Sequence, residues 1–280
     1  MRYLLGIVAL VLSLYGGGER IVALSPAIDE ILFALGKGEE VVGNTLYATY
    51  PEAAKNVPKV GGYFSVSLEK IVALDPTLVL MQRNNLALGS KLEKLGIQTA
   101  LIRINSLADL KAGIVRIGTL TGAKARAEEI VSQIDAHLAK TKGILRDKKI
   151  LIVFGVNFDL DKEIYISGNH LYYADIIRAS GNRNAYTGKS IDQPTVSMEG
   201  IIGMNPDIVY ILAHRIRPDQ TDALIAPWLR LPITAAKAKT IYVTTRKYAG
   251  MPSQRVMRFI DDFRKVLHDA QCKLAALSDR

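Results

Sequence analysis

Residues 66–81 read VSLEKIVALDPTLVLM, and residues 196–211 read VSMEGIIGMNPDIVYI. The two segments repeat one pattern in register. Ser is followed two residues later by Glu, then by a short apolar helix, a turn that contains Pro, and an apolar strand. A self-match of this kind indicates a duplicated supersecondary unit. The repeat therefore predicts two lobes of related architecture.

Short apolar strands alternate with helices around both copies. The strand at residues 20–24 is followed by Ser25 and Pro26, an N-cap and a first-turn proline, which predict a helix that Gly36 ends. Further strands are expected at residues 41–43, 78–81, 100–104, 149–154, 207–212 and 240–244. Strands that alternate with helices pair in parallel, so the predicted fold class is α/β.

A long polar helix is expected between the two copies. Residues 123–145 are rich in Ala, Glu, Lys and Arg, and Ile130, Ile134 and Leu138 form one apolar stripe. Twenty helical residues make a rod of about 30 Å, long enough to join two domains. The alternative is an ordinary surface helix of one domain. The predicted organisation is a signal peptide at 1–18, a first lobe at 19–121, a connecting helix at 122–147 and a second lobe at 148–280.

The first eighteen residues have the layout of a secretory signal peptide. A basic start at Arg2 precedes an apolar run from Tyr3 to Tyr15, and three glycines end the run. No cysteine follows, because the single cysteine is Cys272, so a lipoprotein cut is not expected. The alternative is a buried first strand. Export to the periplasm is the prediction.

Composition narrows the class of partner. The chain has 280 residues, 49% of them hydrophobic, and a formal net charge of +9. Its Lys and Arg residues are dispersed, without the basic blocks and interleaved aromatics of nucleic-acid-binding proteins. The charge favours an anionic small ligand over nucleic acid.

Enzyme motifs are incomplete. Residues 187–190 (TGKS) imitate the end of a phosphate loop, but Arg183 stands where that loop requires glycine. The sequence contains no HExxH and no GxSxG motif. We therefore predict no catalytic residues and no cofactor. A metal chelatase or metal-cluster enzyme with two Rossmann-like lobes is the alternative from another class.

Glu69 and Glu199 occupy the same position in the two copies. Ser67 and Ser197 are expected to cap the helices, and an acid in the first turn stabilises the helix dipole by about 0.3–1 kcal/mol. This local role in stabilising the helix would by itself explain why an acid occurs at both positions. The other interpretation is a matched pair of surface carboxylates, one on each lobe, for a basic partner.

The chain resembles the helical-backbone class (class III) of periplasmic binding proteins of ABC importers, which includes vitamin B12-, ferric-siderophore- and haem-binding members. The resemblance rests on the two copies of the repeat, the long helix, and the segments RIVALSPAIDEILFALG (20–36), YATYPEAAKNVPKVGGY (47–63), GNHLYYADIIRASGNRNAY (168–186) and APWLRLPITAAKAKTIYV (226–243). It implies two Rossmann-like lobes joined by one long interdomain helix, with a ligand cleft between the lobes. It also implies that Glu69 and Glu199 are docking carboxylates that meet arginines on a permease dimer at the inner membrane, with the binding protein acting as a monomer.

The resemblance also suggests ligand contacts. Tyr47 and Tyr63 match aromatic contact positions of the vitamin B12-binding member, although Tyr63 replaces a tryptophan. Further candidates are Tyr50, Arg83, Tyr165, His170, His214, Arg215, Arg217, Arg246 and Tyr248, because Arg suits anionic oxygens and His suits a chelated metal. His214 follows a strand end, where α/β sheets present ligand groups. The predicted function is capture of an iron(III)-siderophore or related metal chelate, with cobalamin or haem as alternative ligands and a ligand-free interaction module as another.

Overall fold

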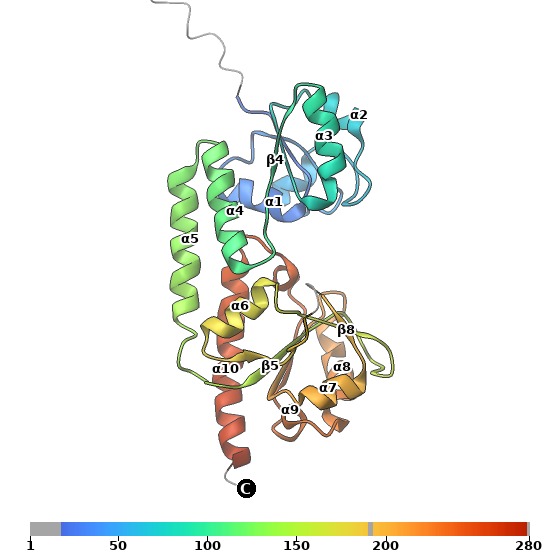
Figure 1. Cartoon of the computed structure of the whole chain (residues 1–280), viewed down its shortest axis with the longest axis vertical. Helices are drawn as coiled ribbons and strands as arrows, with labels where there is room; N and C mark the ends of the chain where they lie inside the picture. Colours follow the sequence, from blue (N-terminus) through green and yellow to red (C-terminus); the bar gives the residue numbers. More distant parts are fainter. Residues whose placement is uncertain (1–17, 190–192, 279–280) are drawn as a thin grey trace, which may run out of the picture. The chain divides into compact units, whose positions relative to one another are not determined.

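The computed structural model describes residues 18–189 and 193–278, in two compact units at Met1–Leu101 and Ile102–Arg280 (Figure 1). The predicted signal peptide at residues 1–18 lies outside the described residues, except for Gly18. Each unit contains its own sheet and its own hydrophobic core. The chain is therefore mixed α/β, as the alternation of strands and helices predicts.

The first unit is built on a parallel four-stranded sheet of order β2-β1-β3-β4. Its elements are β1 (Ile21–Ala23), α1 (Pro26–Ala34), β2 (Val41–Asn44), η1 (Glu52–Asn56), α2 (Leu68–Val72), β3 (Leu78–Met81), η2 (Arg83–Asn85), α3 (Leu86–Lys94) and β4 (Gln98–Leu101). Val22 and Val79 of the central strands pack with Ile71 of α2 and Leu92 of α3, all four of them buried. Alternate strand residues thus point to one face of the sheet, and α2 and α3 cover that face.

The second unit contains a larger, mixed sheet of order β10-β9-β5-β6-β8, with β7 beside β5. Its elements are α4 (Leu107–Leu120), α5 (Lys124–Ala139), β5 (Lys149–Phe154), β6 (Ile164–Ile166), α6 (Tyr172–Ala179), β7 (Arg183–Asn184), β8 (Thr195–Val196), α7 (Met198–Met204), β9 (Ile208–Leu212), η3 (Pro218–Gln220), α8 (Thr221–Ile225), η4 (Trp228–Arg230), α9 (Thr234–Lys237), β10 (Ile241–Thr244), η5 (Lys247–Gly250) and α10 (Val256–Ser278). β10, β9 and β5 pair in parallel, whereas β6 runs antiparallel to β5 and to β8.

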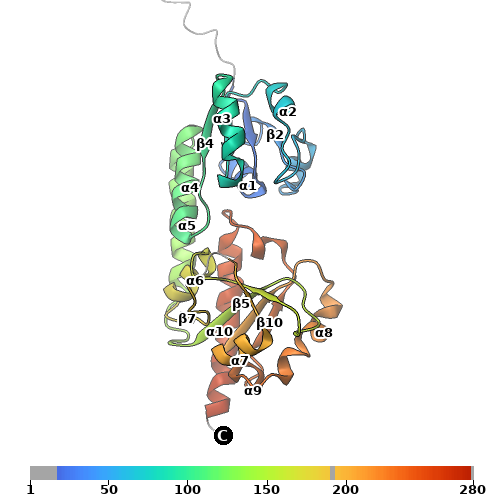
Figure 2. The same cartoon turned by 45° about the vertical axis from the view of Figure 1, so that its right-hand side comes forward.

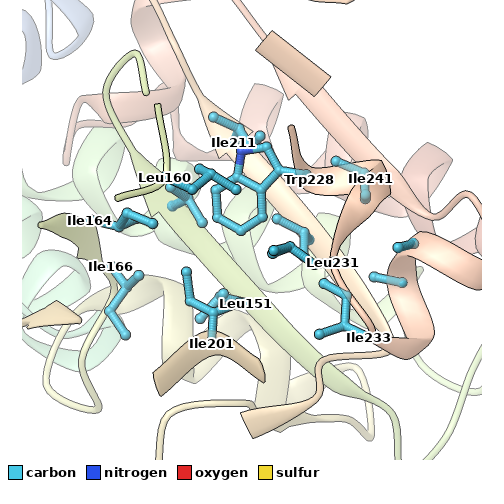
Figure 3. Close-up of a cluster of buried hydrophobic side chains, with 14 of the residues drawn as sticks. Leu151, Leu160, Ile164, Ile166, Ile201, Ile211, Trp228, Leu231, Ile233 and Ile241 are labelled. Carbon is cyan, nitrogen blue, oxygen red and sulfur yellow. The ribbon is translucent and has the colours of Figure 1, made fainter. Parts of the chain in front are cut away.

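Helices cover both faces of this second sheet, with α6 and α10 on one side and α7, α8 and α9 on the other (Figure 2). On the first side, the ring of Tyr210 stacks on Phe259 of α10 at a centroid distance of 5.9 Å, and Phe154 meets Tyr173 of α6 at 5.4 Å. On the other side, the fully buried Trp228 lies among aliphatic side chains (Figure 3). Burial on both faces explains the continuous apolar strands.

The repeat is reproduced in three dimensions. The Ser67 hydroxyl caps α2 by accepting a hydrogen bond from the Lys70 amide at 3.2 Å, and the Ser197 hydroxyl caps α7 through the Gly200 amide at 3.3 Å. In each unit the strand after the capped helix pairs in parallel with the first strand of that sheet, β3 with β1 and β9 with β5. The two copies therefore lie in separate sheets and occupy equivalent places in them.

The predicted lobes at 19–121 and 148–280 stay a prediction, whereas the contacts within the chain give a boundary between the two compact units. It falls between Leu101 and Ile102, so α4 belongs to the second unit, where it packs along α5 and α6. The Leu107 amide donates to the Asp175 carboxylate at 2.7 Å, at the start of α4. Such bonds join residues far apart in the chain, which is why the sequence pattern did not reveal them.

The range 122–147, predicted as a connecting helix, contains α5. α5 covers Lys124–Ala139, 16 residues, and Gly143 then takes a positive φ of 80°, a conformation that favours glycine. Its role as a connector between lobes stays a prediction. Among the residues that the structure describes, none of the helices combines the length and the apolarity that a membrane span requires.

Replacing Trp228 by Ala is expected to lower the free energy of unfolding by about 3–5 kcal/mol, because the change leaves a large cavity in the core of the second unit. The neighbouring Leu229→Ala is the control, since Leu229 is 44% exposed and its loss should change stability by about 0.5 kcal/mol or less. Urea denaturation followed by circular dichroism measures both. Equal effects of the two changes would contradict the core assignment.

Candidate functional site

A pocket of about 670 Å³ lies in the second unit, at the edge of the sheet where its parallel strands end. Its wall is formed by the last residue of β5, by the segments that follow β5 and β9, by Tyr165 of β6 and by Gln193 before β8. The lining residues are Phe154, Gly155, Val156, Phe158, Tyr165, Gln193, Ala213, His214, Arg215, Ile216 and Gln220. The pocket therefore belongs to a single unit and has the size of a small-molecule site.

The sheet itself brings these residues together. β5 ends at Phe154 and β9 ends at Leu212, and the two residues are register partners in the parallel pair. Tyr165 on β6 is the antiparallel partner of Phe154. The chain must leave the sheet at this edge, which is where open α/β sheets hold their ligands. The predicted position of His214 at a ligand-bearing strand end is thus consistent with the pocket.

The surroundings of His214 favour the neutral form of its imidazole. Partial burial lowers the pKa of this imidazole below its ordinary value of 6.5, and the charges of Arg215 and Lys247 lower it further. A neutral imidazole keeps a nitrogen lone pair that can accept a hydrogen bond or coordinate a metal. The pocket thus combines an imidazole nitrogen with an available lone pair and positively charged side chains nearby.

Arg215 and Arg217 differ, although both are exposed. Arg217 places Nε 3.1 Å and Nη2 3.0 Å from the two carboxylate oxygens of Asp219, so its guanidinium already has an ion-pair partner. Arg215 lines the pocket and forms no ion pair with any residue that the structure describes. A guanidinium in this situation is suited to a carboxylate, catecholate or phosphate of a ligand. Arg215 is the stronger candidate of the two.

Apolar and aromatic side chains form the rest of the wall. Phe154, Phe158 and Tyr165 contribute ring surfaces, and Val156 and Ile216 contribute aliphatic surface. Phe158 and Tyr165 are each about half exposed. Large accessible rings next to a cation suit a ligand with an apolar face and a negative group.

Four predicted residues of this unit lie outside the pocket lining, namely Arg217, Tyr248, Arg246 and His170. Tyr248 donates its hydroxyl to Asp262 of α10, and burial together with this bond raises the pKa of Tyr248 to about 12. Tyr248 is thus a structural residue in this conformation. Arg246 is exposed after β10, and its amide donates to the hydroxyl of Thr244 at 3.3 Å. His170 is exposed in the loop before α6.

The predicted residues of the first unit follow β2 and β3 in the chain, and Arg83 begins η2. Tyr47 is 64% exposed in the loop after β2, and Tyr50 is exposed nearby. The hydroxyl of Tyr63 donates to Gln82, directly after β3, at 2.8 Å, and burial raises the pKa of Tyr63. Arg83 follows and is exposed. These side chains offer a mainly aromatic surface with one cation.

A buried polar network fixes the loop that carries Tyr47. Asn44 donates to the Asp29 carboxylate at 3.1 Å and to the Ala54 carbonyl at 2.9 Å, while the Lys59 ammonium reaches the Asn44 side-chain oxygen at 2.6 Å. Burial raises the pKa of Asp29 to about 7, although the Asn44 bond and Lys59 act in the opposite direction. The loop is therefore anchored at both ends to the first unit.

Glu69 and Glu199 are both exposed in the first turns of their helices. The Ser67 hydroxyl donates to Glu69 Oε2 at 2.7 Å, and this bond lowers the pKa of the carboxyl group. The hydrogen bond from Ser197 lowers the pKa of Glu199 in the same way. Each unit thus presents one ionised, solvent-accessible carboxylate at the same place in the repeat.

Sequence reasoning missed the loop after β5, residues 155–158, and the two glutamines of the pocket. The signal for the loop was available, since the strand at 149–154 ends there just as the strand before His214 does. Gln193 and Gln220 carry no comparable pattern. No group of three or more His, Cys, Asp or Glu side chains suited to a metal ion occurs among the residues of 18–189 and 193–278.

Comparison with known proteins gives one family. The family model described as periplasmic binding protein matches residues 21–248. The vitamin B12-binding protein of Vibrio vulnificus (strain YJ016) is 26% identical over 257 residues, which cover 87% of this chain and 88% of that protein. The alignment therefore spans nearly the whole length of both proteins.

Solved structures share the fold. The periplasmic haem-binding protein RhuT from Roseiflexus sp. RS-1 in apo form matches with a TM-score of 0.71 and 25% identity, covering 91% of this chain and all of that one. The periplasmic vitamin B12-binding protein BtuF of Vibrio cholerae matches with a TM-score of 0.76 and 18% identity, covering 90% of this chain and 98% of that one. Such neighbours confirm the class III fold predicted from the sequence, with two α/β lobes.

His214 is expected to titrate below pH 6.5 in the folded chain, because burial and two nearby cations disfavour the imidazolium form. Arg215→Gln removes one of these cations and should raise the midpoint. Arg217→Gln is the matched control and should leave it unchanged, since Asp219 already balances that charge. Histidine-ring NMR over a pH series measures the midpoints, and a midpoint above 6.5 would contradict the site electrostatics.

Proposed function

Because the chain belongs to the periplasmic binding protein family, we propose that it captures an iron(III)-siderophore or related metal chelate in the periplasm and delivers it to the permease of an ABC importer. The family implies a periplasmic location. The family match also favours a binding protein over the chelatase or metal-cluster alternative.

The pocket of the second unit is the observation that carries the proposal. Within one cavity it offers aromatic and aliphatic wall surface, His214 with a lowered pKa, and Arg215, which has no ion-pair partner among the described residues. A metal chelate presents groups that complement these, namely a largely apolar ligand shell, anionic oxygens and a metal centre. We propose that Arg215 binds an anionic oxygen, and that His214 accepts a hydrogen bond or approaches the metal.

The charge of the site favours an anionic chelate over an uncharged one. Arg215 and Lys247 both act on His214, so the pocket border is positive, and the chain as a whole carries +9. Related proteins are named for vitamin B12 or haem. Haem carries carboxylates and fits this border, whereas cobalamin would leave it unbalanced. We therefore place cobalamin behind the anionic chelates.

The tyrosines of the first unit are a separate candidate surface. Tyr47, Tyr50 and Tyr63 suit the apolar faces of a chelate, and Arg83 suits another anionic group. Tyr165, His170 and Arg246 stay candidates in the second unit. Arg217 and Tyr248 would have to leave Asp219 and Asp262 before contacting a ligand.

Delivery requires docking to the membrane. We propose that the chain acts as a monomer, and that Glu69 and Glu199 meet arginines of the permease dimer. What supports this is the duplication of the same exposed and ionised carboxylate, one on each unit. Exposed opposite charges give specificity and fast association rather than high affinity, which suits a carrier that must dissociate.

Arg215→Gln is expected to weaken binding of an anionic chelate by about tenfold to a hundredfold, because it removes one charge-assisted hydrogen bond. Calorimetric titration of a ferric tricatecholate, a ferric trihydroxamate, haem and cyanocobalamin tests this. Arg217→Gln is the control, since the guanidinium of Arg217 is already paired, and a change of about twofold or less is expected. Tightest binding of cyanocobalamin, with no effect of either change, would refute the ligand assignment.

The combined charge reversal Glu69→Lys and Glu199→Lys is expected to abolish uptake while the chelate affinity stays the same, because both side chains are fully exposed. Uptake of a radiolabelled ferric chelate by the reconstituted importer measures the first effect, and calorimetry measures the second. The surface acids Glu128→Lys and Asp135→Lys on α5 are the control. A loss of chelate affinity would show that these carboxylates serve the ligand instead.

A further inference from the structure

A second pocket of about 460 Å³ lies in the second unit, beside the helix that carries Glu199. This second pocket is the α7 groove. Its walls come from the loop between β5 and β6, from α7, and from η4 with the prolines around it. The lining residues are Phe158, Asp159, Leu160, Asp161, Met198, Ile202, Pro227, Arg230, Leu231 and Pro232.

The floor of the α7 groove is the outer border of the main core. Leu160 is 5% and Leu231 is 8% exposed, and both lie beside Trp228 in the core cluster (Figure 3). Met198 and Ile202 pack against the same cluster while remaining partly accessible. The groove is therefore a rigid apolar depression that can take up a large apolar side chain.

The rim of the α7 groove is mainly acidic. Asp159 and Asp161 line the groove and are exposed, and Glu199, which follows Met198 on α7, is exposed outside the lining. The Asp159 carboxylate also accepts a hydrogen bond from the Asp161 amide at 3.0 Å, which fixes this part of the loop. Arg230 contributes one positive charge to the lining. Two exposed aspartates at an apolar depression, with Glu199 exposed on the same helix as Met198, favour a basic partner although the chain as a whole carries +9.

We propose that the α7 groove receives an apolar side chain from a basic periplasmic loop of the permease, next to the contact made by Glu199. The inference rests on the proposed function, because it extends the docking surface of the second unit from one carboxylate to an apolar anchor with an acidic rim. Buried apolar anchors inside a polar rim supply most of the affinity in protein interfaces.

Phe158 gives this surface a connection to the ligand pocket. Its side chain, 46% exposed, lines both the 670 Å³ pocket and the α7 groove. A permease loop seated in the groove therefore contacts the same β5–β6 loop that a chelate contacts from the other cavity.

Docking of the full-length chain to its importer, reconstituted in nanodiscs and measured by biolayer interferometry, tests the proposal. Met198→Gln should weaken docking by about tenfold, because an apolar contact would then bury an amide. Asp159→Asn with Asp161→Asn should slow association by several-fold at low salt and reduce its salt dependence. Leu229→Gln and Glu128→Gln are the matched controls, both exposed and outside the groove lining, and neither should change docking.

Glu199→Lys separates this inference from the proposed function. Loss of docking with Glu199→Lys, while the groove variants behave like the controls, would overturn the α7 groove proposal and leave carboxylate docking in place. Loss with the groove variants but not with Glu199→Lys would keep the groove and refute the role of Glu199. Unchanged docking in all variants would overturn both. Thermal unfolding shows whether each variant is folded. If Met198→Gln proves unstable, the variant with Asp159→Asn and Asp161→Asn tests the groove instead, because both of its side chains are exposed.

Discussion

Parallel strand pairing is the constraint on which the rest of this molecule depends. In a parallel pair every strand ends at the same edge, so the loops after β5 and β9 must emerge side by side. This geometry places Phe158, His214 and Arg215 around one cavity, although the first of them is distant in the chain. Burial of both sheet faces holds the strands in place, whereas the loops at the strand ends stay accessible to a ligand.

The duplicated Ser-x-Glu segment shows how local physics repeats a surface feature. A serine cap satisfies an amide at the start of the helix and also holds the following glutamate ionised and exposed. The same pattern therefore yields the same carboxylate in each unit. What distinguishes the second unit is its surroundings, because α7 borders an apolar groove with two further acids, Asp159 and Asp161.

Much of the fold could be predicted because strands, caps and glycine stops are local signals, as at Ser67, Ser197 and Gly36. His214 was accessible to prediction through its place after a strand. Tertiary contacts were not. The hydrogen bond from Leu107 to Asp175 places α4 in the second unit, and the pairing of Arg217 with Asp219 separates it from Arg215. Two similar arginines in one loop look alike until their partners are known.

The pocket of the second unit is the proposed binding site of the chelate. Hydrogen–deuterium exchange of the full chain, with and without the chelate that binds most tightly, tests this assignment. Slower exchange is expected in peptides that cover residues 154–166 and 211–220, which contain most of the lining residues. Unchanged exchange in both segments, with protection confined to other parts of the chain, would contradict it.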